Sequence, residues 1–143
     1  MQRSEELKKL HADYINEGNF LSTPRLTFAQ AAWAHIERLC IKPKEFCDRT
    51  LLSEKVYERL RDKNYHGRNP ELQTVLQICI GLNLGGVLSE QLLELAGYKL
   101  TAQQLAYKKI LYCYCGHSIY ECDEVLTALG LPSILPKQYR AVG

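Results

Sequence analysis

Apolar residues recur at every third or fourth position along most of this 143-residue chain, with polar residues between them. This spacing places the apolar side chains on one face of an α-helix. Two clear examples run through residues 29–40 and 72–82. Sustained alternation of apolar and polar residues, which is typical of a half-buried β-strand, does not occur. The pattern therefore predicts an all-α fold.

Helix starts are marked by three capping boxes, in which a serine or threonine is followed three residues later by glutamine or glutamate. The hydroxyl accepts a hydrogen bond from the backbone of the later residue, whose side chain bonds back to the cap. The three pairs are Thr27 with Gln30, Thr101 with Gln104, and Ser118 with Glu121. Each pair predicts a helix that begins just after the cap.

Glycine, serine and proline residues predict where other helices begin and end. We expect a first helix from Ser4 to Gly18-Asn19. Another helix begins near Pro70 and is expected to end at Gly85-Gly86, because glycine commonly terminates helices. Ser89 is then expected to start the following helix.

Length and composition favour a single globular unit with a helical extension. The hydrophobic fraction of 46% and the charged fraction of 24% are ordinary for a globular protein. We divide the chain into an N-terminal helix and loop (1–25), a core (26–100) and a C-terminal helical extension packed on that core (101–143). No run approaches the roughly 20 apolar residues that span a bilayer, and the first residues are polar. A cytoplasmic location without membrane contact is therefore expected.

Basic residues are concentrated in one stretch of the chain. The formal net charge of the whole sequence is only +2. Residues 42–68 hold eight Lys and Arg side chains against five Asp and Glu, so this stretch alone carries a charge of +3. A local basic excess is a modest indication of nucleic-acid binding, because it attracts phosphates.

The six cysteines indicate buried thiols rather than disulfides. Cys40, Cys47, Cys79 and Cys122 occupy apolar positions of the helical pattern. In a reducing compartment, a free thiol at such a position acts as a small hydrophobic side chain. We therefore expect these four side chains to be buried.

The spacing Cys113-x-Cys115-x-His117 raises the hypothesis of a zinc site. A structural site needs four ligands, and the usual Cys-x₂-Cys spacing is absent. Alternate residues of a helix also point to different faces. We therefore expect no metal and no cofactor. No serine or cysteine nucleophile beside a base is recognisable either, so no enzymatic activity is expected.

Residues 43–60 have the pattern of two short helices joined by a three-residue turn, with a longer helix on each side, which is the helix-turn-helix plan. This stretch resembles the phage-repressor/Cro family, also described as XRE-like or lambda repressor-like. Phe46 and Cys47 stand at the apolar and small positions of the first helix, and Tyr57 and Leu60 at the core positions of the second. The resemblance implies a repressor-like core of four to five helices, with an N-terminal helix and two additional C-terminal helices.

A closer resemblance is to a bacterial group in which this module carries further C-terminal helices. The shared blocks are residues 57–66, 92–100 and 118–130, and the resemblance covers most of the chain. It implies that the helices of residues 89–131 pack on the core and supply a dimer contact. Modules of this group are also joined to larger proteins with other activities.

The resemblance implies a sequence-specific DNA-binding transcription regulator that acts as a homodimer. The second motif helix, residues 53–61, would enter the major groove of double-stranded DNA. The residues expected to meet base edges are Glu54, Lys55 and Arg59. The residues expected to contact phosphates are Lys42, Lys44, Arg61, Lys63, Asn64, His66 and Arg68.

Departures from the family pattern favour an alternative, a non-enzymatic protein-interaction or adaptor module that keeps the fold without DNA binding. Leu51 stands where the family has a glycine in the turn between the two helices. The backbone at that position often has positive φ, which would strain a leucine, so a turn of different shape is one possible consequence of the substitution. Pro43 stands where the family has a phosphate-binding glutamine, and Glu54 and Glu58 would repel phosphates. A protein partner would dock on the tyrosine-rich C-terminal helices. Their tyrosines are Tyr107, Tyr112, Tyr114 and Tyr120.

Overall fold

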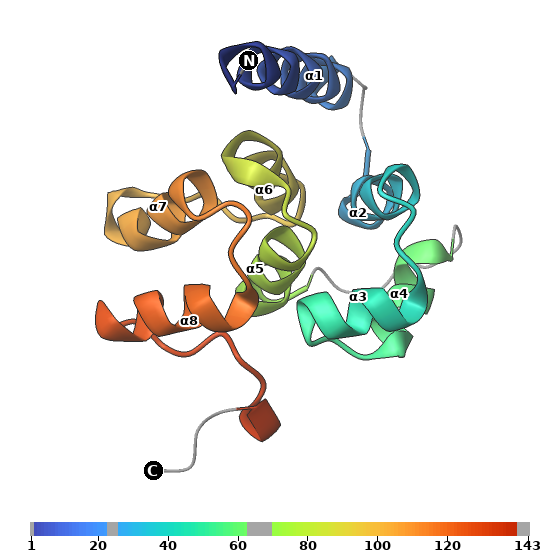
Figure 1. Ribbon diagram of the computed structural model, residues 1–143. Coiled ribbons are helices and arrows are strands. Elements are labelled where there is room, and N and C mark those ends of the chain that lie inside the picture. Colours follow the sequence, from blue (N-terminus) through green and yellow to red (C-terminus); the bar gives the residue numbers. More distant parts are fainter. Residues whose placement is uncertain (1, 23–25, 63–69, 140–143) are drawn as a thin grey trace.

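The computed structural model describes residues 2–22, 26–62 and 70–139 (Figure 1). Within these ranges the regular structure consists of eight α-helices and two short 3₁₀ helices, without a strand, which confirms the all-α prediction. The α-helices are α1 (Gln2–Ser22), α2 (Phe28–Arg38), α3 (Pro43–Thr50), α4 (Glu54–Arg61), α5 (Leu72–Gly81), α6 (Gly85–Leu95), α7 (Leu105–Cys113) and α8 (Ile119–Ala128). The 3₁₀ helices are η1 (Ala102–Gln104) and η2 (Lys137–Tyr139).

Helix α5 lies at the centre of the molecule (Figure 1). Its residues 75–81 are all buried, as expected for a helix with neighbours on every side. It packs against α6, α3 and α8. Helix α4 packs on α2 and α3, and α7 packs on α6 and α8. Helix α5 therefore connects the α2–α3–α4 group to the C-terminal helices.

The C-terminal helices share one hydrophobic core with the earlier helices. Ile110 of α7 and Leu126 of α8 belong to the same buried cluster as the side chains of α2, α3 and α5. The segment after α8 is held by the buried carboxylate of Asp123. This carboxylate accepts hydrogen bonds from the backbone N–H of Ile134 at 2.7 Å and from the hydroxyl of Ser133 at 2.8 Å.

All three predicted capping boxes are present. The hydroxyls of Thr27 and Ser118 accept hydrogen bonds from the backbone of Gln30 and Glu121 at 3.1 and 3.2 Å. The return bonds to the cap N–H groups measure 3.0 Å in both boxes. In the third box the return bond measures 3.2 Å, and the box opens η1, which leads into α7. Helices α2 and α8 therefore begin where the sequence predicts.

Helix α1 is longer than the sequence predicts, because it continues through Gly18-Asn19 to Ser22. An interior glycine costs a helix about 1 kcal/mol relative to alanine. The contacts of Phe20 offset this cost. Its ring stacks on His35 at 4.0 Å, and its carbonyl oxygen accepts a hydrogen bond from the Gln91 side chain at 2.8 Å. The predicted helix end is wrong because tertiary contacts hold the last turn.

Gly85-Gly86 begins a helix rather than ending one. Helix α5 ends earlier, and Asn83 takes a left-handed conformation after it, with φ of 58°. Gly86 lies in the first turn of α6 against the ring of Tyr112, where a Cβ atom would have no room. Ser89, the predicted start, is buried inside α6. The predicted helix end at Gly85-Gly86 is wrong because Gly86 serves another purpose: without a side chain, it allows Tyr112 of α7 to approach α6 closely.

The cysteines among the described residues are all free thiols. Cys79 and Cys122 are buried, which confirms the prediction for these two, and Cys47 is half-buried. Cys40 is exposed, and the prediction for it is wrong. Cys40 follows the last turn of α2, outside the apolar face of that helix. Its backbone is in the left-handed conformation, with φ of 55°, which is common for the residue just after a helix end.

Replacing Cys40 with glycine is expected to raise the free energy of unfolding by about 0.5–1 kcal/mol, because glycine adopts positive φ without strain. The hydrogen bonds of this helix end come from the backbone, so the substitution keeps them: Cys40 N–H to Glu37 and Ile41 N–H to Ile36, both at 3.1 Å. Urea denaturation under reducing conditions measures the change. The matched variant Cys40→Ala also removes the thiol but keeps a Cβ atom. Equal stabilities of the two variants would contradict the prediction.

Candidate functional site

Helices α3 and α4 are two eight-residue helices joined by the three residues 51–53. The backbone reverses at Leu51, which has φ of 61° and donates its N–H to the Cys47 carbonyl at 2.9 Å. A non-glycine residue in this conformation is strained by about 1–2 kcal/mol. The strain expected at Leu51 is therefore present, and the burial of its side chain offsets the strain.

Aromatic packing fixes α4 against α2 and α3. Phe46 of α3 is fully buried, and its ring meets the ring of Tyr57 edge-on at 5.4 Å. Trp33 of α2 contacts the same tyrosine at 5.2 Å. The Tyr57 hydroxyl donates a hydrogen bond to the Ile41 carbonyl at 3.0 Å. Phe46, Tyr57 and Leu60 are buried, as the sequence predicts.

Polar contacts and a close backbone approach fix α3 against α5. The side chain of Gln77 donates to the Thr50 carbonyl at 3.0 Å, and Arg49 Nε donates to the Gly81 carbonyl at 2.7 Å. A Cβ atom at Gly81 would lie only 2.7 Å from the Arg49 carbonyl oxygen and from Thr50 Cγ2. The α3–α4 pair is therefore held rigidly on the core by both of its helices.

The outward face of α4 carries the residues predicted to meet base edges. Glu54, Lys55 and Arg59 are all exposed, and the two basic residues lie one helical turn apart. Tyr57 and Leu60 occupy the opposite, buried face of the same helix. This arrangement leaves the Lys55 and Arg59 side chains facing solvent rather than lying beneath another part of the described chain.

The predicted phosphate contacts are placed only in part. Lys42 and Lys44 are exposed at the start of α3, and Arg61 is exposed at the end of α4, with its guanidinium 5.9 Å from the Tyr57 ring centroid. The remaining four residues lie outside the described residues. They are Lys63, Asn64, His66 and Arg68.

Acidic side chains reduce the positive charge of this surface. Over residues 42–62 there are six Lys and Arg side chains against five Asp and Glu. One of the six, Arg49, is already engaged by the Gly81 carbonyl and by Glu45 at 3.5 Å. Burial, with Glu54 and Asp48 close by, raises the pKa of the Cys47 thiol. The surface is thus mixed in sign rather than strongly basic.

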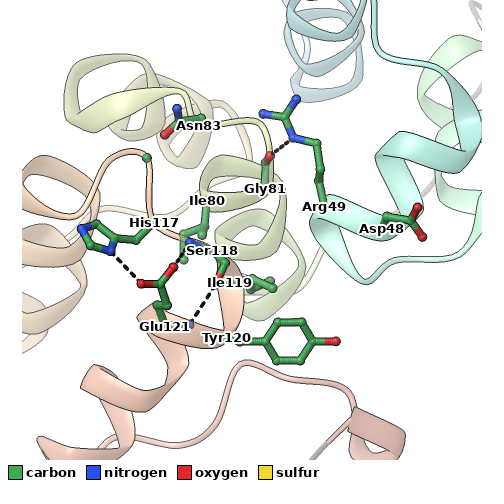
Figure 2. Close-up of a pocket in the computed structure, with 11 residues that line it drawn as sticks. Asp48, Arg49, Ile80, Gly81, Asn83, His117, Ser118, Ile119, Tyr120 and Glu121 are labelled. Atoms are coloured by element: carbon green, nitrogen blue, oxygen red, sulfur yellow. Dashed lines mark hydrogen bonds and ion pairs between the residues drawn. The ribbon is translucent and has the colours of Figure 1, made fainter.

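A second site, which the sequence analysis missed, is a cleft of about 360 Å³ where α3, the end of α5 and the start of α8 meet (Figure 2). Asp48 lines it from α3, and Tyr120 lines it from α8. His117 contacts Glu121 at 3.1 Å, and the Ser118 backbone lowers the pKa of this carboxylate by hydrogen bonding, with His117 as the second cause. The Ser118 hydroxyl accepts a hydrogen bond from the Glu121 backbone N–H at 3.2 Å, so both His117 and Ser118 bond to Glu121 at this end of the cleft.

The Cys113-x-Cys115-x-His117 segment is not assembled as a ligand set. Cys115 contacts the Asn83 side chain at 3.1 Å, while His117 faces Glu121. In the part of the chain that the structure describes, no group of three His, Cys, Asp or Glu side chains is arranged to hold a metal ion.

The C-terminal tyrosines have separate neighbours. Tyr112 donates a hydrogen bond to Glu90 of α6 at 3.0 Å, and burial followed by this bond raises its pKa. The Tyr114 ring lies 4.8 Å from that of His117. Tyr120 lines the cleft of Figure 2, and Tyr107 is half-buried. Each of the four tyrosines therefore has its own set of neighbours.

Two further observations concern the chain as a whole. Among the described helices, none combines the length and apolar character needed to cross a bilayer. Comparisons with protein-family models, with curated proteins and with solved structures found no match for this chain.

Proposed function

We propose that this protein is a sequence-specific DNA-binding transcription regulator, with α3 and α4 as a repressor-type helix-turn-helix. The observation that carries the proposal is the exposed face of α4, on which Lys55 and Arg59 lie one turn apart. An α-helix fits the major groove, where lysine and arginine donate hydrogen bonds to guanine and glutamate accepts from cytosine. Glu54 supplies the acceptor beside them.

The rigid attachment of the pair supports this proposal. A recognition helix reads bases only if its side chains are held at a fixed depth in the groove, which phosphate contacts set. Lys42 and Lys44 stand at the N-terminal end of α3, where the helix dipole also favours an anion. Pro43 removes one backbone donor from this end, so the two lysines would supply the phosphate contacts there.

A second candidate function is an adaptor that binds another protein through the same fold. The mixed charge of the α3–α4 surface favours it, since Glu45, Asp48 and Glu58 would approach the phosphates of bound DNA. Such repulsion weakens nonspecific DNA binding, which depends on net positive charge.

Selection from a random pool of duplex DNA, followed by salt titration, tests the proposal. A regulator should enrich a palindrome with half-sites about one helical turn apart. Its binding should weaken at least about 100-fold between about 50 and 200 mM salt, because counterions are released. The double variant Lys55→Glu/Arg59→Glu should lose at least about 100-fold in affinity for the enriched sequence.

The matched control changes the same charge at a distance from α4. Lys99 and Lys109 are exposed, and Lys99→Glu/Lys109→Glu alters the net charge equally. The control should retain the sequence preference and lose only a small part of the affinity. If both double variants lose affinity equally, or if no sequence is enriched, the regulator proposal fails and the adaptor is favoured.

A further inference from the structure

The charged side chains on the outward face of α4 are sorted into two lines. Glu54 and Glu58 lie one turn apart and form an acidic line. Lys55 and Arg59 also lie one turn apart and form a basic line beside it. Residues four positions apart differ by only about 40° around a helix, while adjacent residues differ by about 100°. The two lines therefore run along the helix side by side and point in different directions.

The other side chains of α4 restrict the kinds of base that the helix can read. Tyr57 and Leu60 are buried, and Val56 is half-buried. The helix contains no asparagine or glutamine, the side chains that pair with adenine through two hydrogen bonds. It also has no fully exposed apolar side chain to contact the methyl group of thymine. The outward face therefore offers base edges only charged donors and charged acceptors.

A G·C pair matches both lines at once. In the major groove, guanine presents two acceptors, N7 and O6, and cytosine presents an amine donor. The basic line can donate to guanine, and the acidic line can accept from the cytosine on the opposite strand. An A·T pair fits less well, because adenine places the acceptor N7 beside its amine and thymine combines one acceptor with a methyl group.

The spacing along α4 matches two G·C pairs that have one base pair between them. Four residues advance an α-helix by about 6 Å, and two base-pair steps advance DNA by about 6.8 Å. Glu54 and Lys55 then meet the first pair, and Glu58 and Arg59 meet the second. Because each line keeps to one side of the helix, both guanines lie on the same strand.

The acidic line also makes binding depend on the bases. Carboxylates near DNA weaken nonspecific binding, which relies on positive charge. A glutamate that meets an acceptor or a methyl group in the groove is left as an unpaired charge, which costs more than the loss of a neutral hydrogen bond. The two glutamates therefore penalise every sequence that offers them no amine.

We propose that each half-site contains two G·C pairs separated by one base pair, with both guanines on one strand, and that Glu54 and Glu58 determine this specificity. The inference rests on the proposed function, because an adaptor does not read bases. It gives the acidic residues of α4, which otherwise favour the adaptor, a part in sequence recognition.

Selection from a random pool of duplex DNA with the wild type, Glu54→Gln and Glu58→Gln tests the inference. The wild type should enrich two G·C pairs with one base pair between them. Glutamine pairs with adenine through N6 and N7, so each variant should shift one position from cytosine toward adenine. Glu54→Gln should change one of the two pairs and Glu58→Gln the other. At the changed position, the ratio of the affinities for cytosine and adenine should fall at least about fivefold.

The matched control is Glu124→Gln, which removes the same charge from an exposed position on α8. The control should keep the base preference of the wild type at both positions. An enriched sequence without the two G·C pairs would overturn the inference and leave the regulator proposal standing. So would unchanged base preferences in Glu54→Gln and Glu58→Gln, or an equal change in Glu124→Gln. If the wild type enriches no sequence, the regulator proposal and this inference both fail.

Discussion

Acidification from pH 6.5 to about 3 is expected to remove about 3–5 kcal/mol of folding stability through His35 alone, at no more than about 1.4 kcal/mol per pH unit. His35 lies on α2, is fully buried and stacks on Phe20 of α1. Burial is the larger cause that lowers its pKa to about 3, and the positive charge of Arg38 is the smaller one. The unfolded chain binds the proton from pH 6.5 downward, whereas the folded chain resists it. The stability is therefore fully present above pH 6.5 and is lost as the pH falls toward 3.

Urea denaturation of the wild type and His35→Gln between pH 7.5 and 4 measures this contribution. Glutamine cannot be protonated, and its side-chain oxygen can still accept the hydrogen bond that Arg38 Nε donates to His35 Nδ1 at 3.0 Å. Carboxylates titrate in both proteins, so the difference between the two curves isolates the histidine. His11→Gln, at an exposed histidine, is the control and should follow the wild type. Parallel curves for the wild type and His35→Gln would refute the prediction.

Replacing Phe46 with alanine is expected to lower the free energy of unfolding by about 3–5 kcal/mol. The Phe46 side chain is fully buried and packs against Tyr57, so its removal leaves a cavity at the junction of α3 and α4. Backbone hydrogen bonds hold both neighbouring helices, and collapse of the site around the cavity is therefore limited. Chemical denaturation, with the slope as a check of two-state behaviour, measures the loss.

Two variants calibrate the Phe46 result. Phe46→Leu keeps most of the side-chain volume and should cost about 1–2 kcal/mol. Leu129→Ala, at an exposed leucine, should change stability by less than about 0.5 kcal/mol. If Phe46→Ala costs no more than Leu129→Ala, α3 does not pack as described.

Features that depend on neighbouring residues in the sequence could be predicted. A capping box joins residues three positions apart, so Thr27 and Ser118 form the same bonds wherever the helix lies in the fold. The periodicity of α4 similarly separates buried Tyr57 and Leu60 from exposed Lys55 and Arg59. Both the all-α class and the outward placement of these basic side chains follow from such local patterns.

Features that depend on distant residues could not be predicted. Gly86 has the sequence signal of a helix end, but the ring of Tyr112, far along the chain, decides its role. Gly18 fails to end α1 because Phe20 finds partners on α2 and α6. The local pattern of apolar and polar residues in one sequence does not indicate which distant residues will be in contact.

The cleft of Figure 2 illustrates the same limit for a site. Asp48, Ile80 and Tyr120 come from three helices or helix ends that are separated by more than thirty residues in sequence. Each has an ordinary local role in its own helix. Only the packing of α3 and α8 on α5 brings them to one surface, so no local pattern indicates the cleft.

The two buried thiols can report when the helices that carry them transiently separate from the core. Cys79 on α5 and Cys122 on α8 are each 1% exposed, and burial raises the pKa of Cys79 to about 12. An alkylating reagent in solution can reach either sulfur only during an excursion that frees the helix carrying it. Mass spectrometry after short pulses of such a reagent would therefore compare the alkylation rates of Cys79 and Cys122 without denaturant. Equal rates would indicate that α5 and α8 open together, and different rates that one opens before the other.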